Sequence, residues 1–249
     1  MGDVVAKPAD AETPALSFPE RLLGVFISPG ETFADVARKP GFWAPLIAIV
    51  LGALAVIETM LWKIGLERIV RMQLEQGGQA SRMSPDQIDQ AVRMGVRIGG
   101  ITTHVFGVLG PPIVLLIIAG LGLLIVNPIL GAQAKFKAVF SLVCYADLIS
   151  LLGSLMAVAM ILFGDPEQFN VENPVPSNVG FFLNPHEVSK PLYSLASSAD
   201  ILTIWLLILL GVGLSKATGG KVKPLPIFLL YVGIWLVWVL GKAGLKLIM

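Results

Sequence analysis

Five long apolar stretches interrupt the polar positions of this 249-residue chain. A stretch of about 20 apolar residues can cross the hydrocarbon core of a bilayer as an α-helix, because lipid offers the backbone no hydrogen-bond partners. The pattern therefore predicts an all-α integral membrane bundle of five transmembrane helices with short amphipathic surface helices. The predicted spans are 42–64, 103–130, 138–163, 199–215 and 225–247. Prolines expected to kink or end these helices locally are Pro45, Pro111, Pro112 and Pro128.

A shorter segment, residues 18–41, alternates apolar and polar positions at helical spacing. Ser28, Pro29 and Glu31 fit an N-cap, a first-turn proline and the acid of a capping box. We expect two short interfacial helices here, between a disordered N-terminal tail (1–17) and the five-span domain (42–249). The side chains expected to face the lipid or the bundle are Phe18, Leu22, Val25, Phe26, Phe33 and Val36.

Two further connections separate the spans. Ser84, Pro85 and Gln87 repeat the capping signal and predict a surface helix ahead of the second span, either a solvated connector or a membrane-contacting element. The proline-rich connection 165–198 has no sustained period and is predicted to be a loop that is ordered in part.

Composition agrees with a membrane class. Hydrophobic residues make up 55% and charged residues 14% of the chain, against about 25% charged in globular proteins, and mean hydropathy is +0.79. The lipid bilayer is therefore the first expected partner. A net charge of +1 gives no sign of a nucleic-acid partner. The single cysteine, Cys144, excludes an intramolecular disulfide.

Basic residues in the short loops indicate the orientation of the chain. Lysines follow the second span (Lys135, Lys137) and the fourth span (Lys216, Lys221, Lys223), which places the N-terminus in the cytoplasm. Arginines in the 65–102 connection favour the opposite orientation, so charge alone leaves the topology of that connection open.

Asp147 lies inside the third predicted span, about 13 Å from its start at 1.5 Å per residue. An ionised carboxylate near the midplane costs at least about 2.5–3.5 kcal/mol, so Asp147 is expected to be protonated or partnered. Ser150 and Ser154 share its helical face, which makes these three residues a candidate intramembrane polar site. They predict either a packing contact between helices or a polar path for protons or ions.

A second candidate is an outer-interface polar cluster of Glu58, His104 and Lys242, which the predicted spans place at similar depth. A Glu58–Lys242 ion pair with His104 nearby would close that end of the bundle. The alternative is separate side chains that reach the headgroups.

No motif of an enzyme is present: the chain has no phosphate-binding loop, no HExxH and no GxSxG, and its two histidines are too far apart for a metal motif. We therefore predict no catalytic residue, no cofactor and no metal site.

Three stretches carry a family resemblance. They are "ISPGETFADVARKPGFWAPL" before the first span, "FKAVFSLVCYADLISLLGSL" through the third, and the C-terminal pair "ADILTIWLLILLGVGLSKATGGK" and "FLLYVGIWLVWVL". In order and spacing the chain resembles the bacterial branch of the Ypt-interacting-protein (Yip) family, the Yip domain integral membrane proteins.

The resemblance implies a cytoplasmic N-terminus and an extracytoplasmic C-terminus in the bacterial inner membrane. Eukaryotic members are associated with vesicle trafficking, membrane shaping and small GTPases of the Rab class. Small-GTPase binding is not expected here, because the tail is short and Asp147-Leu148 replaces the small residue and proline of the eukaryotic pattern.

The sequence thus predicts a non-enzymatic polytopic membrane protein that organises membrane or recruits partners, as a homo-oligomer or with another membrane protein. The alternative is a transporter, channel or lipid scramblase subunit that uses Asp147 in a polar path.

Overall fold

The computed structural model describes residues 15–76, 78, 80–164, 170, 173–185 and 187–248, and its regular elements are helical. The main helices are α1 (Phe18–Ile27), α2 (Pro29–Arg38), α3 (Trp43–Lys63), α4 (Leu66–Gln76), α5 (Pro85–Leu124), α6 (Phe136–Ala146), α7 (Ser150–Phe163), α8 (Lys190–Ser198), α9 (Ile201–Ala217) and α10 (Pro224–Ile248). Shorter turns are η1 (Ala80–Arg82), η2 (Ile125–Ile129), η3 (Asp147–Ile149) and η4 (Val179–Phe182).

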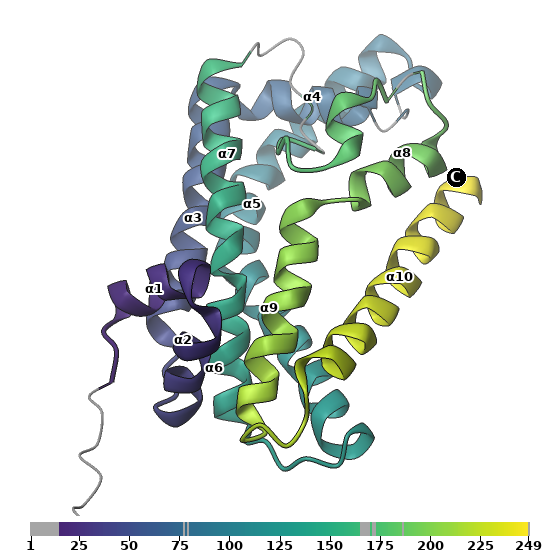
Figure 1. The fold of residues 1–249 in the computed structure, drawn as a ribbon. Helices are drawn as coiled ribbons and strands as arrows, with labels where there is room; N and C mark the ends of the chain where they lie inside the picture. Colours follow the sequence, from purple (N-terminus) through teal and green to yellow (C-terminus); the bar gives the residue numbers. More distant parts are fainter. Residues whose placement is uncertain are drawn as a thin grey trace, which may run out of the picture.

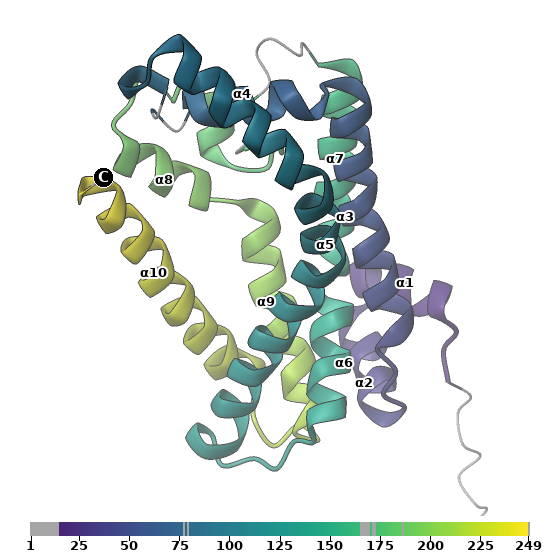
Figure 2. The same ribbon diagram turned by 180° about the vertical axis from the view of Figure 1, so that it is seen from behind.

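The bundle is built around α6 and α7, which follow one another as a single column with α3 and α9 beside it (Figure 1). Every residue of α6 from Val139 to Ala146 is buried. Seen from behind, α5 crosses the bundle obliquely, and α10 leans away from α9 (Figure 2). Because α6 is enclosed on several sides while α5 and α10 lie outside, the core follows the third predicted span.

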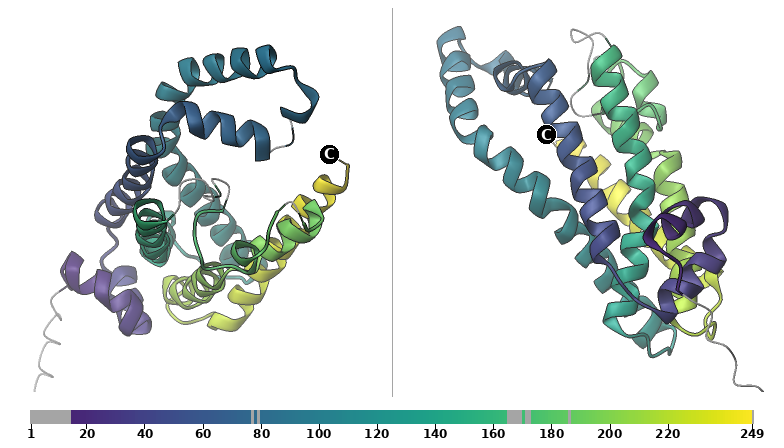
Figure 3. Two further views of the ribbon diagram at one scale, coloured as in Figure 1. Left: turned by 90° about the horizontal axis from the view of Figure 1, so that it is seen from above. Right: turned by 90° about the vertical axis from the view of Figure 1, so that its left-hand side faces the viewer.

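The two ends of the bundle differ. Loops 131–135 and 218–223 lie at one end, which we name the lysine end, whereas α4, η4 and α8 form the cap end. Viewed from above, α4 and the first turns of α5 extend across the cap end as a separate arm (Figure 3).

Within the described residues, four helices are long and apolar enough to cross a membrane: α3, α5 with η2, α6 with α7, and α10. Only 17% to 28% of the residues in their most apolar windows are buried within the protein, so apolar side chains point outward. The shorter apolar helix α9 has 17 residues and a length of about 26 Å. Four of these five segments match predicted spans closely in position, and the second predicted span is the exception.

The second span differs from the prediction. A separate surface helix and a span were expected, but α5 runs through both as one helix of 40 residues. Ser84 and Gln87 cap its start as predicted. Gly95 and Gly99 lie within this helix, and the side chains of Val70 and Leu66 from α4 pack against them.

The C-terminal end of the second span lies close to its predicted position. The helix passes through Pro111 and Pro112 and ends after a π-turn that contains Pro128. Asn127 then fixes the following loop, because its side chain donates to the Ala134 carbonyl and accepts from the Ala134 amide at 3.1 and 2.8 Å.

Two local predictions are wrong. The Ser28 side chain forms no cap at the start of α2; the capping box forms instead at α1, where Glu20 accepts from the Ser17 amide and hydroxyl at 2.7 Å each. The connection 165–198 contains a helix, α8, which starts after Ser189 with Pro191 in its first turn. Parts of this connection (165–169, 171, 172 and 186) and most of the predicted tail (1–14) lie outside the described residues.

Candidate functional site

Asp147 lies where the column of α6 and α7 is interrupted by the tighter turn η3. This turn contacts α3 and α9. The Asp147 carboxyl group hydrogen-bonds the Ser150 hydroxyl one turn further along the same helix. None of the ion pairs recorded for the described residues involves Asp147. The immediate partner of this carboxyl group is therefore a serine of its own helix.

Ser154, the third member of this predicted site, faces a different neighbour. A Cβ atom built on Gly52 of α3 would lie 3.2 Å from the Ser154 Oγ and 2.8 Å from a methyl group of Leu151. Helices α3 and α7 thus approach closely at a glycine, as small residues allow in membrane bundles. Asp147 and Ser150 meet, while Ser154 belongs to the contact between two helices.

Two of the three residues of the predicted outer-interface cluster, Glu58 and His104, lie in contact. His104 Nε2 lies 2.8 Å from Glu58 Oε1, and His104 Nδ1 lies 2.8 Å from the Gly100 carbonyl oxygen. Only the doubly protonated imidazolium donates to both acceptors at once. Both side chains are largely exposed, so this is a surface link between α3 and α5.

Lys242 does not join this pair. Its Nζ donates to the Ser198 Oγ at 3.0 Å and so ties α10 to α8. The predicted Glu58–Lys242 ion pair is therefore corrected, because α10 leans toward α8 and carries Lys242 away from α3.

A polar cluster that the sequence reasoning missed joins α1 to α2 and meets the bundle at Tyr145 of α6. The buried Asp35 carboxylate accepts from Arg21 Nε at 2.9 Å and Nη2 at 2.8 Å, and from Arg38 Nη2 at 2.7 Å. The Arg21 guanidinium lies 5.7 Å from the centre of the Tyr145 ring of α6, a cation–π arrangement. We name Arg21, Asp35 and Arg38 the hairpin clasp.

Apolar contacts complete this attachment. Val25, Phe33 and Val36 are fully buried, and the Phe33 ring lies against Gly213 of α9. Helix α2 packs on α9 and α6, so the apolar side of the segment faces the bundle. Leu23 and Ile27 point the other way and are 58% and 81% exposed.

The pKa of Asp35 follows from these contacts. Burial alone would raise the pKa of this carboxyl group, but hydrogen bonds from Arg38 and Arg21, together with the charge of Arg21, outweigh it. The pKa therefore lies below its ordinary value of 3.8. The clasp holds a carboxylate over the whole physiological pH range.

A signal for the clasp was present in the sequence. Arg21 lies one turn before Val25, and Asp35 lies between Phe33 and Val36, so each charge interrupts an apolar stripe. Opposite charges on two buried stripes predict an ion pair between them, since an unpaired buried charge is costly.

The fold defines the class: an all-α, multi-pass membrane protein whose core helix carries one acidic residue at an interrupted turn. The sequence pattern of the Yip1 domain matches residues 23–242, and the chain belongs to the Yip1 domain family. It is similar to membrane protein YknW of Bacillus subtilis (strain 168), with 27% identity over 205 residues that cover 81% of this chain and 80% of YknW. No solved structure matches the chain.

Proposed function

We propose that this Yip1-domain protein organises the bacterial cytoplasmic membrane or recruits partner proteins to it, without enzymatic activity. The observation that carries the proposal is the clasped hairpin of α1 and α2, which holds Leu23 and Ile27 outward at a fixed place on the bundle. A rigid element that exposes apolar side chains suits binding of lipid or protein, because little ordering entropy is lost on contact.

The proposal includes five spans with a cytoplasmic N-terminus. Support comes from the ends of the bundle, since the two lysine-bearing loops and the hairpin lie away from α4 and α8. Basic short loops favour the cytoplasmic side. Helix α9 is the fifth span in this topology, and its length of about 26 Å is close to the hydrocarbon thickness of about 30 Å.

The partners in this proposal are lipid and a second membrane protein, either another copy or a different chain. The outward apolar faces of α5 and α10 support it. Exposed side chains there include Phe106 and Leu109 on α5, and Val237 and Trp238 on α10.

The rival function is transport through a polar path at Asp147. The tighter turn η3 favours it, because a short 3-10 stretch within a helix often marks a functional hinge. The bond to Ser150 favours a packing role instead, since it satisfies the carboxyl group within one helix.

The test is site-specific photocrosslinking in native membranes. A photoreactive side chain at Ile27 is expected to give a discrete protein adduct, whereas one at Phe163, which is 87% exposed at the cap end, serves as the matched control. Adducts of equal yield at both positions would contradict the proposal.

Reconstitution tests the rival function. Liposomes that contain the full chain are expected to move ions and lipids no faster than empty liposomes. A flux that the Asp147→Asn variant abolishes would replace our proposal with a transport function.

A further inference from the structure

A cleft lies between α2 and α9 at the lysine end. Its volume is about 490 Å³, within the range of about 300–1,000 Å³ typical of small-molecule sites. The residues that line it are Ala34, Ala37, Arg38, Lys216, Ala217, Gly219 and Gly220. Small side chains leave this space open, and a Cβ atom built on Gly219 or Gly220 would meet nothing within 4 Å.

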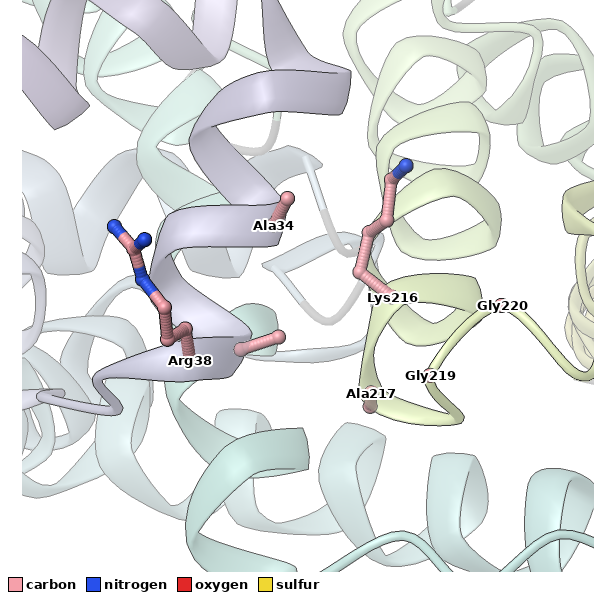
Figure 4. A pocket seen from close by; sticks show the side chains of 7 residues that line it. Ala34, Arg38, Lys216, Ala217, Gly219 and Gly220 are labelled. Atoms are coloured by element: carbon pink, nitrogen blue, oxygen red, sulfur yellow. The ribbon is translucent and has the colours of Figure 1, made fainter. Parts of the chain in front are cut away.

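Lys216 is the cation placed to use this space. Figure 4 shows its side chain standing beside the cleft opposite Ala34, whereas Arg38 turns its guanidinium toward the outer side of α2. Among the described residues, no recorded ion pair or hydrogen bond engages the Lys216 ammonium group. Its three donors are therefore available to a ligand.

The surroundings of the cleft are positive. Asp35 is shared by two guanidinium groups, so the hairpin clasp keeps a net positive charge. Within residues 18–41, 131–137 and 216–223, eight side chains are basic and three are acidic. An anion at the cleft is thus attracted by charges from three separate segments.

The backbone of the 218–223 loop does not supply the contacts. The amides of Gly219 and Gly220, which have positive φ values of 67° and 78°, donate to the carbonyls of Lys216 and Ser215 at the end of α9. Recognition of an anion therefore depends on side chains, with Lys216 as the nearest donor.

We infer that this cleft binds the phosphate of an anionic phospholipid, with Lys216 as the contacting cation and Arg38 as a supporting charge. A lipid is the ligand that fits the location, because Lys216 is in the last turn of an apolar helix, where the headgroups of the bilayer meet the protein. The inference rests on the membrane class of the chain and goes beyond the proposed recruitment of partners.

The test is native mass spectrometry of the full chain in detergent, titrated with phosphatidylglycerol or phosphatidylcholine. The first phosphatidylglycerol is expected to bind more tightly than phosphatidylcholine. The Lys216→Gln variant is expected to weaken that binding about fivefold, the effect of one cation near a membrane surface.

Two further variants make the test specific. Lys223→Gln removes a lysine of the same loop outside the cleft and is expected to weaken binding much less than Lys216→Gln does. Ala34→Leu keeps every charge but occupies the cleft, and is expected to weaken binding as well. Thermal unfolding of each variant shows whether the fold is retained.

Several outcomes would overturn the inference. Equal losses in Lys216→Gln and Lys223→Gln would mean a diffuse surface charge without a site. Equal affinities for the two lipids would mean that the headgroup charge is not recognised. Displacement of the lipid by inorganic phosphate would identify a soluble anion as the ligand. None of these outcomes alters the photocrosslinking result, so the proposed function stands or falls separately.

Discussion

At the residue scale, one carboxylate holds the two helices of the N-terminal hairpin together. Asp35 receives hydrogen bonds from Arg21 on α1 and Arg38 on its own helix, and Arg21 in turn lies over Tyr145 of the core helix. Loss of Asp35 leaves Arg21 buried without a counter-charge, which is more costly than the loss of a surface pair.

We therefore expect Asp35→Ala to destabilise docking of the hairpin by about 3 kcal/mol, the lower part of the range for one partner of a buried pair. Limited proteolysis within residues 18–41 measures this docking, and cleavage should become faster in the variant. Glu31→Ala, on the exposed side of the same helix, is the control and should change little. Unchanged proteolysis of Asp35→Ala would mean that apolar contacts alone hold the hairpin.

The same residue predicts a pH dependence. Because the folded-state pKa of Asp35 lies below the unfolded value of 3.8, its contribution is complete above that value. It is lost as the pH falls through the lower folded-state pKa. Titration of Asp35 should therefore not change the hydrogen-exchange protection of α1 and α2 between about pH 5 and about pH 8, since this range begins about one unit above the ordinary pKa. A loss of protection relative to the intrinsic exchange rate already near pH 6 would contradict this assignment.

At the element scale, α5 and α10 are joined by one hydrogen bond at a close approach. The Tyr231 hydroxyl donates to the Ile118 carbonyl at 2.8 Å, and a Cβ atom on Gly122 would lie 2.6 Å from that hydroxyl. Gly122 is thus required by contact with a tyrosine on another helix.

This geometry predicts a coupled pair of mutations. Gly122→Ala should displace Tyr231 and destabilise the protein by about 1–3 kcal/mol, and Tyr231→Phe by about 1 kcal/mol. The double variant should lose less than the sum, because removal of the hydroxyl makes room for the new methyl group. Thermal unfolding in detergent measures the cycle.

Gly110→Ala provides the control for this cycle. No atom lies within 4 Å of a Cβ built at Gly110, so the substitution should be neutral or stabilising. Strict additivity of Gly122→Ala and Tyr231→Phe would show that the two residues do not interact.

The sequence was most informative about the membrane-spanning helices, because the thickness of the hydrocarbon core sets their length. The hydrocarbon core requires about 20 apolar residues, so apolar helices lie where spans were predicted, although α5 begins well before the second predicted span. The continuity of α5 and the turn at Asp147 could not be predicted, since both depend on contacts with other helices. Val70 of α4 lies against Gly95 of α5, and that contact exists only in the folded bundle.

For the candidate sites, too, contacts set by spacing or depth could be predicted, whereas a contact set by helix packing could not. Asp147 and Ser150 are three residues apart, so their contact follows from helical spacing alone. Glu58 and His104 were matched by depth and do meet. Lys242 was predicted to join them because it lies at the same depth. Depth alone does not show that α10 leans toward α8, which brings Lys242 to Ser198.

At the scale of the whole molecule, the proposed topology has a direct test. Cysteines introduced by Gln73→Cys on α4 and Lys221→Cys in the 218–223 loop lie at opposite ends, and both positions are exposed. In intact cells a membrane-impermeant maleimide should label the first and reach the second only after permeabilisation. Cys144 is buried and should stay unlabelled. The reverse pattern would place the N-terminal hairpin outside the cell.

The length of α5 has a mechanical consequence. Its 40 residues span about 60 Å, twice the hydrocarbon thickness of about 30 Å. One continuous helix, with Pro111 and Pro112 in its interior, therefore runs from the arm at the cap end to the loop that Asn127 holds at the lysine end. Because no loop separates the arm from the part that crosses the bundle, the direction of the arm is set by the backbone of the same helix.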